Sequence, residues 1–217
     1  MEINKIGMTE DTLTGRGGLF FFVRYLTNIG IFSLLSEYSG GIRRSRKGLP
    51  AADLFKQMFC FFCDGTSFHL TYSDALADDA GYAASVEQNP DDMASSHVIK
   101  RFCKSFSIFK IWIFRKILQK LFIWRLKIEN PQVIRIGIDT MVMNNNEADV
   151  RHGVGPTYKK IKGFQPLQIT WENFVIDAVF RGGVRHSNHG DTVIKTVRHL
   201  VNLIRSKYSE NAVIVIT

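Results

Sequence analysis

The C-terminal part of the sequence follows the order strand, hairpin, helix, strand, and this order constrains the fold more than any other feature. The first strand is predicted at 133–139, where the isoleucines at positions 134, 136 and 138 share one face. Two strands at 165–171 and 174–180, joined by a tight turn, come next. A helix with apolar side chains every three or four residues then precedes the β-branched run at 212–217. We expect this last strand to be buried on both faces and reached by a right-handed crossover.

The sequence of residues 1–130 predicts helices rather than strands. Glycine-rich and Asn-Pro turn signals divide this region into roughly four or five helices. The clearest of them begins after Ser95 or Ser96 and continues to Ile128, because apolar residues recur throughout at steps of three and four. With the boundary at Pro131, we predict an α+β protein with a helical region at 1–130 and a mixed sheet at 131–217.

The chain is basic, since 28 Lys and Arg residues against 20 Asp and Glu residues give a formal net charge of +8. Such a charge favours nucleic acid or a membrane surface as partner and does not choose between them.

The apolar runs are shorter than the ~20 residues of a spanning helix, so we predict no transmembrane segment. Three cysteines and no charged-then-apolar leader indicate a reducing, cytoplasmic setting. Cys60 and Cys63 have the spacing of half a metal motif, but their aromatic neighbours predict two buried side chains.

Four basic segments are candidates for contact with nucleic-acid phosphates, and the alternative for each is a solvated surface. They lie in a Gly-flanked loop, near the start of the long helix, after the first strand, and in a Gly-rich turn. In that turn His186 and His189 offer a weaker, metal-binding alternative. The candidate residues are Arg43, Arg44, Arg46 and Lys47; Lys100, Arg101 and Lys104; Lys159, Lys160 and Lys162; and Arg181 and Arg185.

Asp139 is the last residue of the first predicted strand. Ligands and metal ions collect at the carboxyl ends of strands in sheets with parallel neighbours, and Gly137 leaves space on the same face. The alternative is that the Asp139 side chain only caps the following turn. Spacing and periodicity do not decide between these two roles.

Several short motifs resemble bacterial insertion-sequence transposases of the DDE type, specifically insertion-sequence family 1380. Most of them surround Asp139 or lie in the predicted hairpin, and three fall in the helical region. The motifs are IDTMVM (138–143), RHGV (151–154), PTYKK (156–160), KGFQPLQ (162–168), DAVFRGG (177–183) and HSNHG (186–190), with GLPA (48–51), DGTS (64–67) and SSHVIKRF (95–102) before them. The resemblance covers almost the whole chain.

The resemblance implies an RNase H-like catalytic core in which Asp139 is the first acidic ligand for Mg²⁺ or Mn²⁺. It also implies that a second Asp directly follows the strand at 213–216 and that a Glu lies much further on. On this basis we expect a truncated, N-terminal fragment containing three strands, a helix and a fourth strand of that core. The implied activity is cleavage of DNA at the ends of an insertion sequence and strand transfer into target DNA, at the bacterial nucleoid in the cytoplasm.

The segment Asn144, Asn145 and Asn146 departs from the family pattern, which has acidic residues around a central Asn. Amide oxygens remain, but the negative charge that helps to hold a hard divalent cation is lower. Glu147 and Asp149 are expected to be solvated loop acids.

One carboxylate cannot position two metal ions, so we expect the chain to be inactive alone. An alternative is a non-catalytic DNA-binding remnant that occupies element ends or pairs with full-length transposase, as in a homo-oligomer, and inhibits it. A third interpretation is a partly folded product without a role.

Overall fold

The computed structural model describes residues 11, 13–42, 47–107, 110–147, 151–185 and 192–217. The chain divides into two compact units, a helical unit (Met1–Ile111) and a sheet unit (Trp112–Thr217), and each is described by itself. Arg43, Arg44 and Arg46 lie outside the described residues, as do the predicted alternatives Asp149, His186 and His189.

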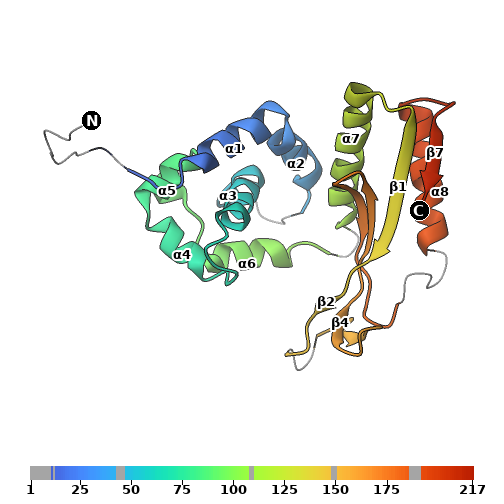
Figure 1. The fold of residues 1–217 in the computed structure, drawn as a ribbon. Coiled ribbons are helices and arrows are strands. Elements are labelled where there is room, and N and C mark those ends of the chain that lie inside the picture. The colour runs from blue at the N-terminus through green and yellow to red at the C-terminus, as the bar shows by residue number, and fades with distance from the viewer. Residues whose placement is uncertain (1–10, 12, 43–46, 108–109, 148–150, 186–191) are drawn as a thin grey trace, which may run out of the picture. The chain divides into compact units, whose positions relative to one another are not determined.

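The helical unit is built around α3, which packs against α1, α2 and α6 (Figure 1). Its apolar core includes the buried side chains of Val23, Cys60, Tyr82 and Val86. Its elements are α1 (Gly18–Asn28), α2 (Ile31–Ser39), α3 (Ala51–Asp64), α4 (Tyr72–Ala77), α5 (Ala80–Ser85), the short helix η1 (Pro90–Asp92) and α6 (Ser96–Lys104).

Arg16 connects three of these elements. Its Nε donates a hydrogen bond to Asp64 at the end of α3, and its two terminal nitrogens donate to Asp79, 3.0 Å away, and to the Tyr72 hydroxyl, 3.2 Å away. Asp79 also caps α5 by accepting from the Tyr82 N–H. The Gly-rich segment around Arg16 is therefore fixed by side-chain hydrogen bonds.

The buried thiol of Cys60 gives the helical unit a pH-dependent stability. Burial raises the pKa of Cys60 to about 12, whereas an unfolded thiol has a pKa of about 8.5. The neutral Cys60 thiol contributes stability that is fully present below about pH 8.5. As the pH rises above about 8.5 the free energy of unfolding decreases, by up to about 1.4 kcal/mol per pH unit. Between pH 8 and pH 10, Cys60 should lower the free energy of unfolding of the unchanged chain by about 2 kcal/mol. In Cys60→Ala the decrease over the same pH range should be about 2 kcal/mol smaller, and urea unfolding at both pH values measures this. Equal pH dependence in both proteins would contradict this.

The sheet unit contains a four-stranded mixed sheet in the order β6-β5-β1-β7. β1 (Val133–Thr140) pairs antiparallel with β5 (Leu167–Trp171) and parallel with β7 (Val213–Ile216), and β6 (Phe174–Val179) pairs antiparallel with β5. A second, three-stranded antiparallel sheet has the order β2-β4-β3. Its strands are β2 (Met143–Asn144), β3 (Gly155–Pro156) and β4 (Lys162–Phe164). The predicted α+β class, with helices first and a mixed sheet after them, is confirmed.

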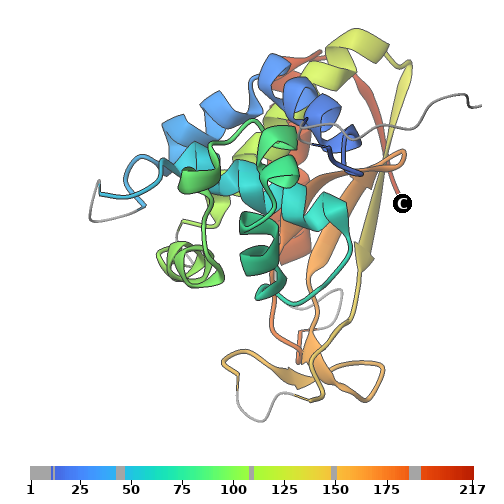
Figure 2. The same cartoon turned by 90° about the vertical axis from the view of Figure 1, so that its left-hand side faces the viewer.

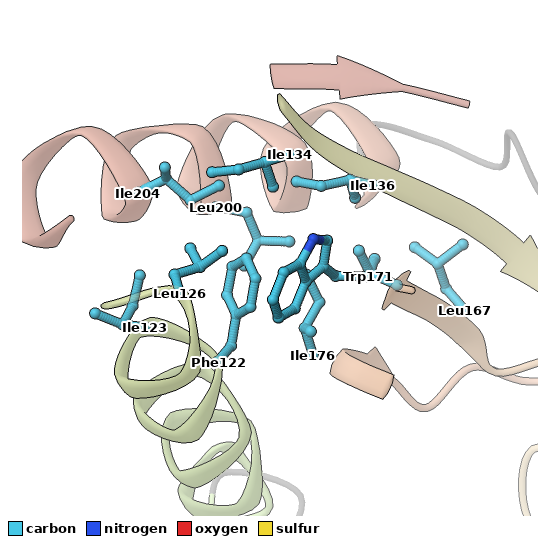
Figure 3. Close-up of a cluster of buried hydrophobic side chains, with 11 residues drawn as sticks. Phe122, Ile123, Leu126, Ile134, Ile136, Leu167, Trp171, Ile176, Leu200 and Ile204 are labelled. Atoms are coloured by element: carbon cyan, nitrogen blue, oxygen red, sulfur yellow. The ribbon is translucent and has the colours of Figure 1, made fainter. Parts of the chain in front are cut away.

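Helices α7 (Trp112–Glu129) and α8 (Thr192–Lys207) supply apolar side chains to one face of the larger sheet (Figure 3). The predicted inward face of β1 is confirmed, since Ile134 and Ile136 are each 1% exposed. Trp171 stacks beside Phe122 with ring centroids 5.5 Å apart. The cluster comprises Phe122, Ile123, Leu126, Ile134, Ile136, Leu167, Ile169, Trp171, Ile176, Leu200 and Ile204.

The single long helix predicted from Ser95 to Ile128 was wrong, because the structure has two helices, α6 and α7, in different compact units. The Ser105 N–H and hydroxyl both donate to the Phe102 carbonyl oxygen, which ends α6. Phe102 and Phe106 then pack around the Phe55 ring. The sheet unit thus begins with α7, whereas the sequence placed the boundary at Pro131.

The last strand is also less buried than predicted. β7 lies at the edge of the sheet, and Val213 and Val215 are 56% and 40% exposed. Ile214 packs against the core, because α8 covers one face of the strand. Within the described ranges no single helix is long and apolar enough to cross a membrane; α1 and α2, bent by 64° at their junction, pass that test only as a pair.

Candidate functional site

Asp139 lies near the carboxyl end of β1, on the face opposite to the buried isoleucines. Its backbone partner is Gln168 of β5, and its side chain is exposed. One carboxylate oxygen accepts a hydrogen bond from the Thr140 N–H at 2.7 Å. This local bond is of the kind expected for a capping role, and it leaves an exposed carboxylate at the strand end.

The end of β7 lies beside the same stretch of β1. The Thr217 N–H donates to the Ile136 carbonyl (2.9 Å), and the Ile138 N–H donates to the Thr217 carbonyl (3.0 Å). Thr217 therefore neighbours Gly137, two residues before Asp139. A Cβ at Gly137 would lie 2.7 Å from the Thr170 hydroxyl oxygen and 4.0 Å from that of Thr217. Gly137 thus lets the Thr170 hydroxyl approach the face that carries Asp139.

A complete metal centre is not present among the described residues, which include no group of three or more His, Cys, Asp or Glu side chains able to hold an ion. The donor type at Asp139 suits a hard cation such as Mg²⁺, but a single carboxylate supplies few of its six ligands. Cys60 is buried as predicted, whereas Cys63 is exposed, contrary to prediction.

The three asparagines form hydrogen bonds within the turn after β2 and to the first residue of β4. The Asn144 side-chain oxygen accepts from the Asn146 N–H at 2.9 Å, and that of Asn146 faces the Lys162 N–H at 3.4 Å. The Asn145 N–H donates to the Lys162 carbonyl. These hydrogen bonds assign a structural role to Asn144 and Asn146 in the turn after β2.

The small sheet projects beyond the carboxyl end of β1 in both ribbon views (Figures 1 and 2). It carries a basic turn, in which the Thr157 hydroxyl and N–H both donate to the Ile161 carbonyl. Lys159 and Lys160 of this turn and Lys162, the first residue of β4, are exposed. The structure therefore places three of the candidate phosphate contacts on the extension that follows Asp139.

The expected phosphate contact of Arg181 is not supported. Its side chain is buried, donates to the Gln165 carbonyl at 3.1 Å and donates to the Thr140 hydroxyl at 2.9 Å. Burial lowers the pKa of Arg181, and the charge of Arg185 acts in the same direction. Arg181 thus connects the end of β1 to the segment before β5. Arg185, by contrast, is exposed.

The exposed face of α6 carries a cationic stripe, defined here as Lys100, Arg101 and Lys104. These positions lie on one helix face at i, i+1 and i+4, and all three are exposed. Ile99 and Phe102 on the opposite side are buried.

The start of α6 is fixed from two directions. Ser95, one of the two predicted N-cap candidates, caps it by accepting from the Val98 N–H. Asp74 of α4 accepts from the Ser96 N–H (2.6 Å) and hydroxyl (2.7 Å), and these bonds lower the pKa of Asp74. Lys47, the remaining described basic candidate, is exposed near this helix and lines a cavity together with Arg101.

A buried polar network in the sheet unit was not predicted from the sequence. Asp177 of β6 is fully buried and accepts two hydrogen bonds from Arg115 of α7, both 2.7 Å long. Gln119 also donates to Asp177 (2.9 Å), and its side-chain oxygen lies 3.0 Å from Nε2 of His199 in α8. The sequence signal for this network is Asp177, the one carboxylate in the otherwise apolar strand β6. A buried carboxylate requires a hydrogen-bonding partner.

Comparisons of the chain with models of protein families, with curated proteins and with solved structures found no match. The resemblance to DDE transposases therefore stays a prediction from the motifs. The structure itself supports a helical unit and a mixed-sheet unit with an exposed carboxylate at a strand end.

Proposed function

We propose that the sheet unit is the first part of an RNase H-like core of a DDE transposase and that Asp139 is its first acidic metal ligand. The observation that carries this proposal is the position of Asp139, exposed at the carboxyl end of β1 beside the end of the parallel strand β7. An antiparallel three-strand meander, a helix and a fourth strand parallel to the first is the order expected for such a core.

The proposed activity is cleavage of DNA and transfer of the cut strand. Two Mg²⁺ ions, when bound, activate water or a 3′-hydroxyl group and stabilise the leaving oxygen. In this chain Asp139 would hold a cation through its exposed carboxylate oxygen. Lys159, Lys160 and Lys162, on the extension beyond Asp139, would hold the DNA backbone by charge. Further acidic ligands would come from outside the described residues or from another chain.

Asp139→Asn tests the metal-ligand role. We expect the 217-residue chain to bind Mn²⁺ weakly, with a dissociation constant of about a millimolar, and the variant to bind about tenfold more weakly, because the amide lacks the charge. Paramagnetic broadening of the amide signals of Thr140 and Gln168 by Mn²⁺ measures this at the site.

Glu147→Gln is the matched control, since it removes the same charge from an exposed residue on the extension. Broadening of Thr140 and Gln168 should be unchanged in that variant. If Asp139→Asn behaves like Glu147→Gln, Asp139 is only a structural residue at the strand end.

A second candidate function is DNA binding without cleavage, in a protein that occupies element ends or pairs with a full-length transposase. The cationic stripe favours it, because it lies on the exposed face of α6, and an α-helix with its side chains is ~10–12 Å across, which fits a major groove ~12 Å wide. Salt-dependent DNA binding without strand transfer in Mg²⁺ or Mn²⁺ identifies this function.

A further inference from the structure

The hairpin formed by β3 and β4 ends in a three-residue loop that carries Tyr158, Lys159 and Lys160. The Thr157 N–H donates to the Ile161 carbonyl at 3.0 Å, and the Lys160 N–H donates to the Thr157 carbonyl at 2.9 Å. Lys160 has a φ of 59°, which is the left-handed last position of a hairpin loop of this length. The backbone of the loop therefore has one defined conformation.

The base of this hairpin is closely packed. A Cβ atom at Gly163 of β4 would clash with the Met143 carbonyl oxygen of β2. One at Gly183 would clash with the carbonyl oxygens of Gly155 and Gly163. The buried Gln165 side chain also donates a hydrogen bond to the Gly183 carbonyl. These contacts support the hairpin, whereas an isolated two-stranded ribbon is only marginally stable.

The loop exposes an aromatic ring beside positive charges. Tyr158 is 60% exposed, although a large aromatic ring usually gains stability from burial. The Lys159 Nζ atom lies 5.8 Å from the centroid of this ring, and both Lys159 and Lys160 are exposed. The loop thus combines the two features of a site for single-stranded nucleic acid, a ring on which a base can stack and positive charge for the backbone.

The surface around the loop is also positive. Glu147 is the only carboxylate among residues 141–147 and 151–166, the described residues of the small sheet and its connections. The exposed Lys and Arg residues in the same ranges are Arg151, Lys159, Lys160 and Lys162. This excess of positive charge favours a polyanion such as a nucleic-acid backbone as the partner of the loop.

We infer that the loop binds single-stranded DNA, with the Tyr158 ring stacked on an unpaired base and with Lys159 and Lys160 in contact with the flanking phosphates. Neighbouring base pairs cover the base faces inside a duplex, so the ring can stack where the strand is open. Stacking accepts any base, because every base has a π-face. The inference rests on the proposed contact of the extension with DNA and adds the form of DNA that is held there. Metal binding at Asp139 takes no part in it.

Fluorescence anisotropy of the 217-residue chain in EDTA, with a fluorescein-labelled 12-mer of thymidylate, tests the stacking. We expect Tyr158→Ala to weaken binding about tenfold, because one stacked base is lost. Tyr158→Phe keeps the ring and should stay within about twofold of the unchanged chain. The matched control is Tyr25→Ala, which removes a tyrosine of similar exposure, 57%, from α1 in the helical unit. It should also stay within about twofold.

A 12-mer in which every nucleotide is abasic separates stacking from phosphate contact. Tyr158→Ala should change its binding by less than about twofold, since this strand has no base to stack. Lys159→Gln combined with Lys160→Gln removes two phosphate contacts. The slope of log affinity against log salt should then fall by about 1.4 for both strands, at about 0.7 per phosphate.

The stacking inference is overturned if the unchanged chain does not bind the thymidylate strand, or if Tyr158→Ala weakens binding of the two strands equally. A loss below about twofold on the thymidylate strand overturns it as well. If the lysine variant still lowers the slope in these cases, the proposed phosphate contacts stand without stacking. If the lysine variant changes the slope for neither strand, the proposed role of Lys159 and Lys160 in holding DNA is wrong too.

Discussion

Asp177→Ala should lower the free energy of unfolding of the sheet unit by about 3–5 kcal/mol, towards the lower end because Arg115 is partly exposed. The substitution leaves the Arg115 charge without its carboxylate and the buried Gln119 amide without its acceptor. Both groups would then have lost water without a compensating partner. Urea unfolding followed by tryptophan fluorescence measures the loss, because Trp112, Trp124 and Trp171 all belong to the sheet unit.

Two further variants separate the ion pair from a general effect of substitution. Glu147→Ala removes an exposed carboxylate in the same unit and should change stability by less than about 0.5 kcal/mol. Arg115→Met combined with Asp177→Leu removes both charges and should recover the part of the loss that comes from the unpaired Arg115, since a buried ion pair and an apolar pair of similar size have comparable stability. The Gln119 amide stays without its acceptor in this variant, so its share of the loss should remain. A cost below about 1 kcal/mol for Asp177→Ala would show that water reaches Arg115 and replaces the carboxylate.

The sequence predicted those helices and strands whose buried face follows from the spacing of apolar residues within the element itself. The alternation in β1 placed Ile134 and Ile136 in the core because successive side chains of a strand point to opposite faces. The spacing in α8 placed Leu200 and Ile204 in the same core. Parallel pairing of β7 with β1 followed from the intervening helix.

Periodicity did not reveal which core each apolar segment joins. The stripe from Val98 to Ile128 is continuous in the sequence, yet Phe102 packs with Phe55 and Phe122 packs with Trp171. α6 ends between them, where the Ser105 hydroxyl and N–H both donate to the Phe102 carbonyl in the last turn of the helix. A period of three to four residues is the same for both helices, so it cannot locate the division.

The burial of Asp177 and Arg181 was not predicted, because their partners are also distant in the sequence. The side chains of Asp177 and Arg115 are 62 residues apart in sequence, and Arg181 reaches Thr140 across 41 residues. Charged side chains are usually exposed, and the partner that allows each of these to be buried lies too far along the sequence to be identified from it. The position of Asp139 at a strand end was predictable because the strand pattern around it is contiguous in the sequence. The residues that would lie near it come from distant segments and could not be predicted in this way.

Neutralising the cationic stripe should separate DNA binding from metal chemistry. The triple variant Lys100→Gln, Arg101→Gln, Lys104→Gln removes three charges from the exposed face of α6 and leaves the buried Ile99 and Phe102 unchanged. If all three contact phosphates, the slope of log affinity against log salt should fall by about 2.7, at about 0.9 per phosphate, and affinity at low salt should fall about 100-fold. Fluorescence anisotropy with a labelled 20-base-pair duplex in EDTA measures both quantities.

The control triple Lys127→Gln, Arg198→Gln, Lys207→Gln removes the same net charge from exposed positions on α7 and α8. A specific role for α6 requires the first triple to lose far more affinity than the second, since overall charge affects both alike. Similar losses would assign DNA binding to the general basic charge of the chain. Because Asp139→Asn leaves the stripe intact, it should bind the duplex normally in EDTA, so that loss of DNA binding and loss of metal binding are independent measurements.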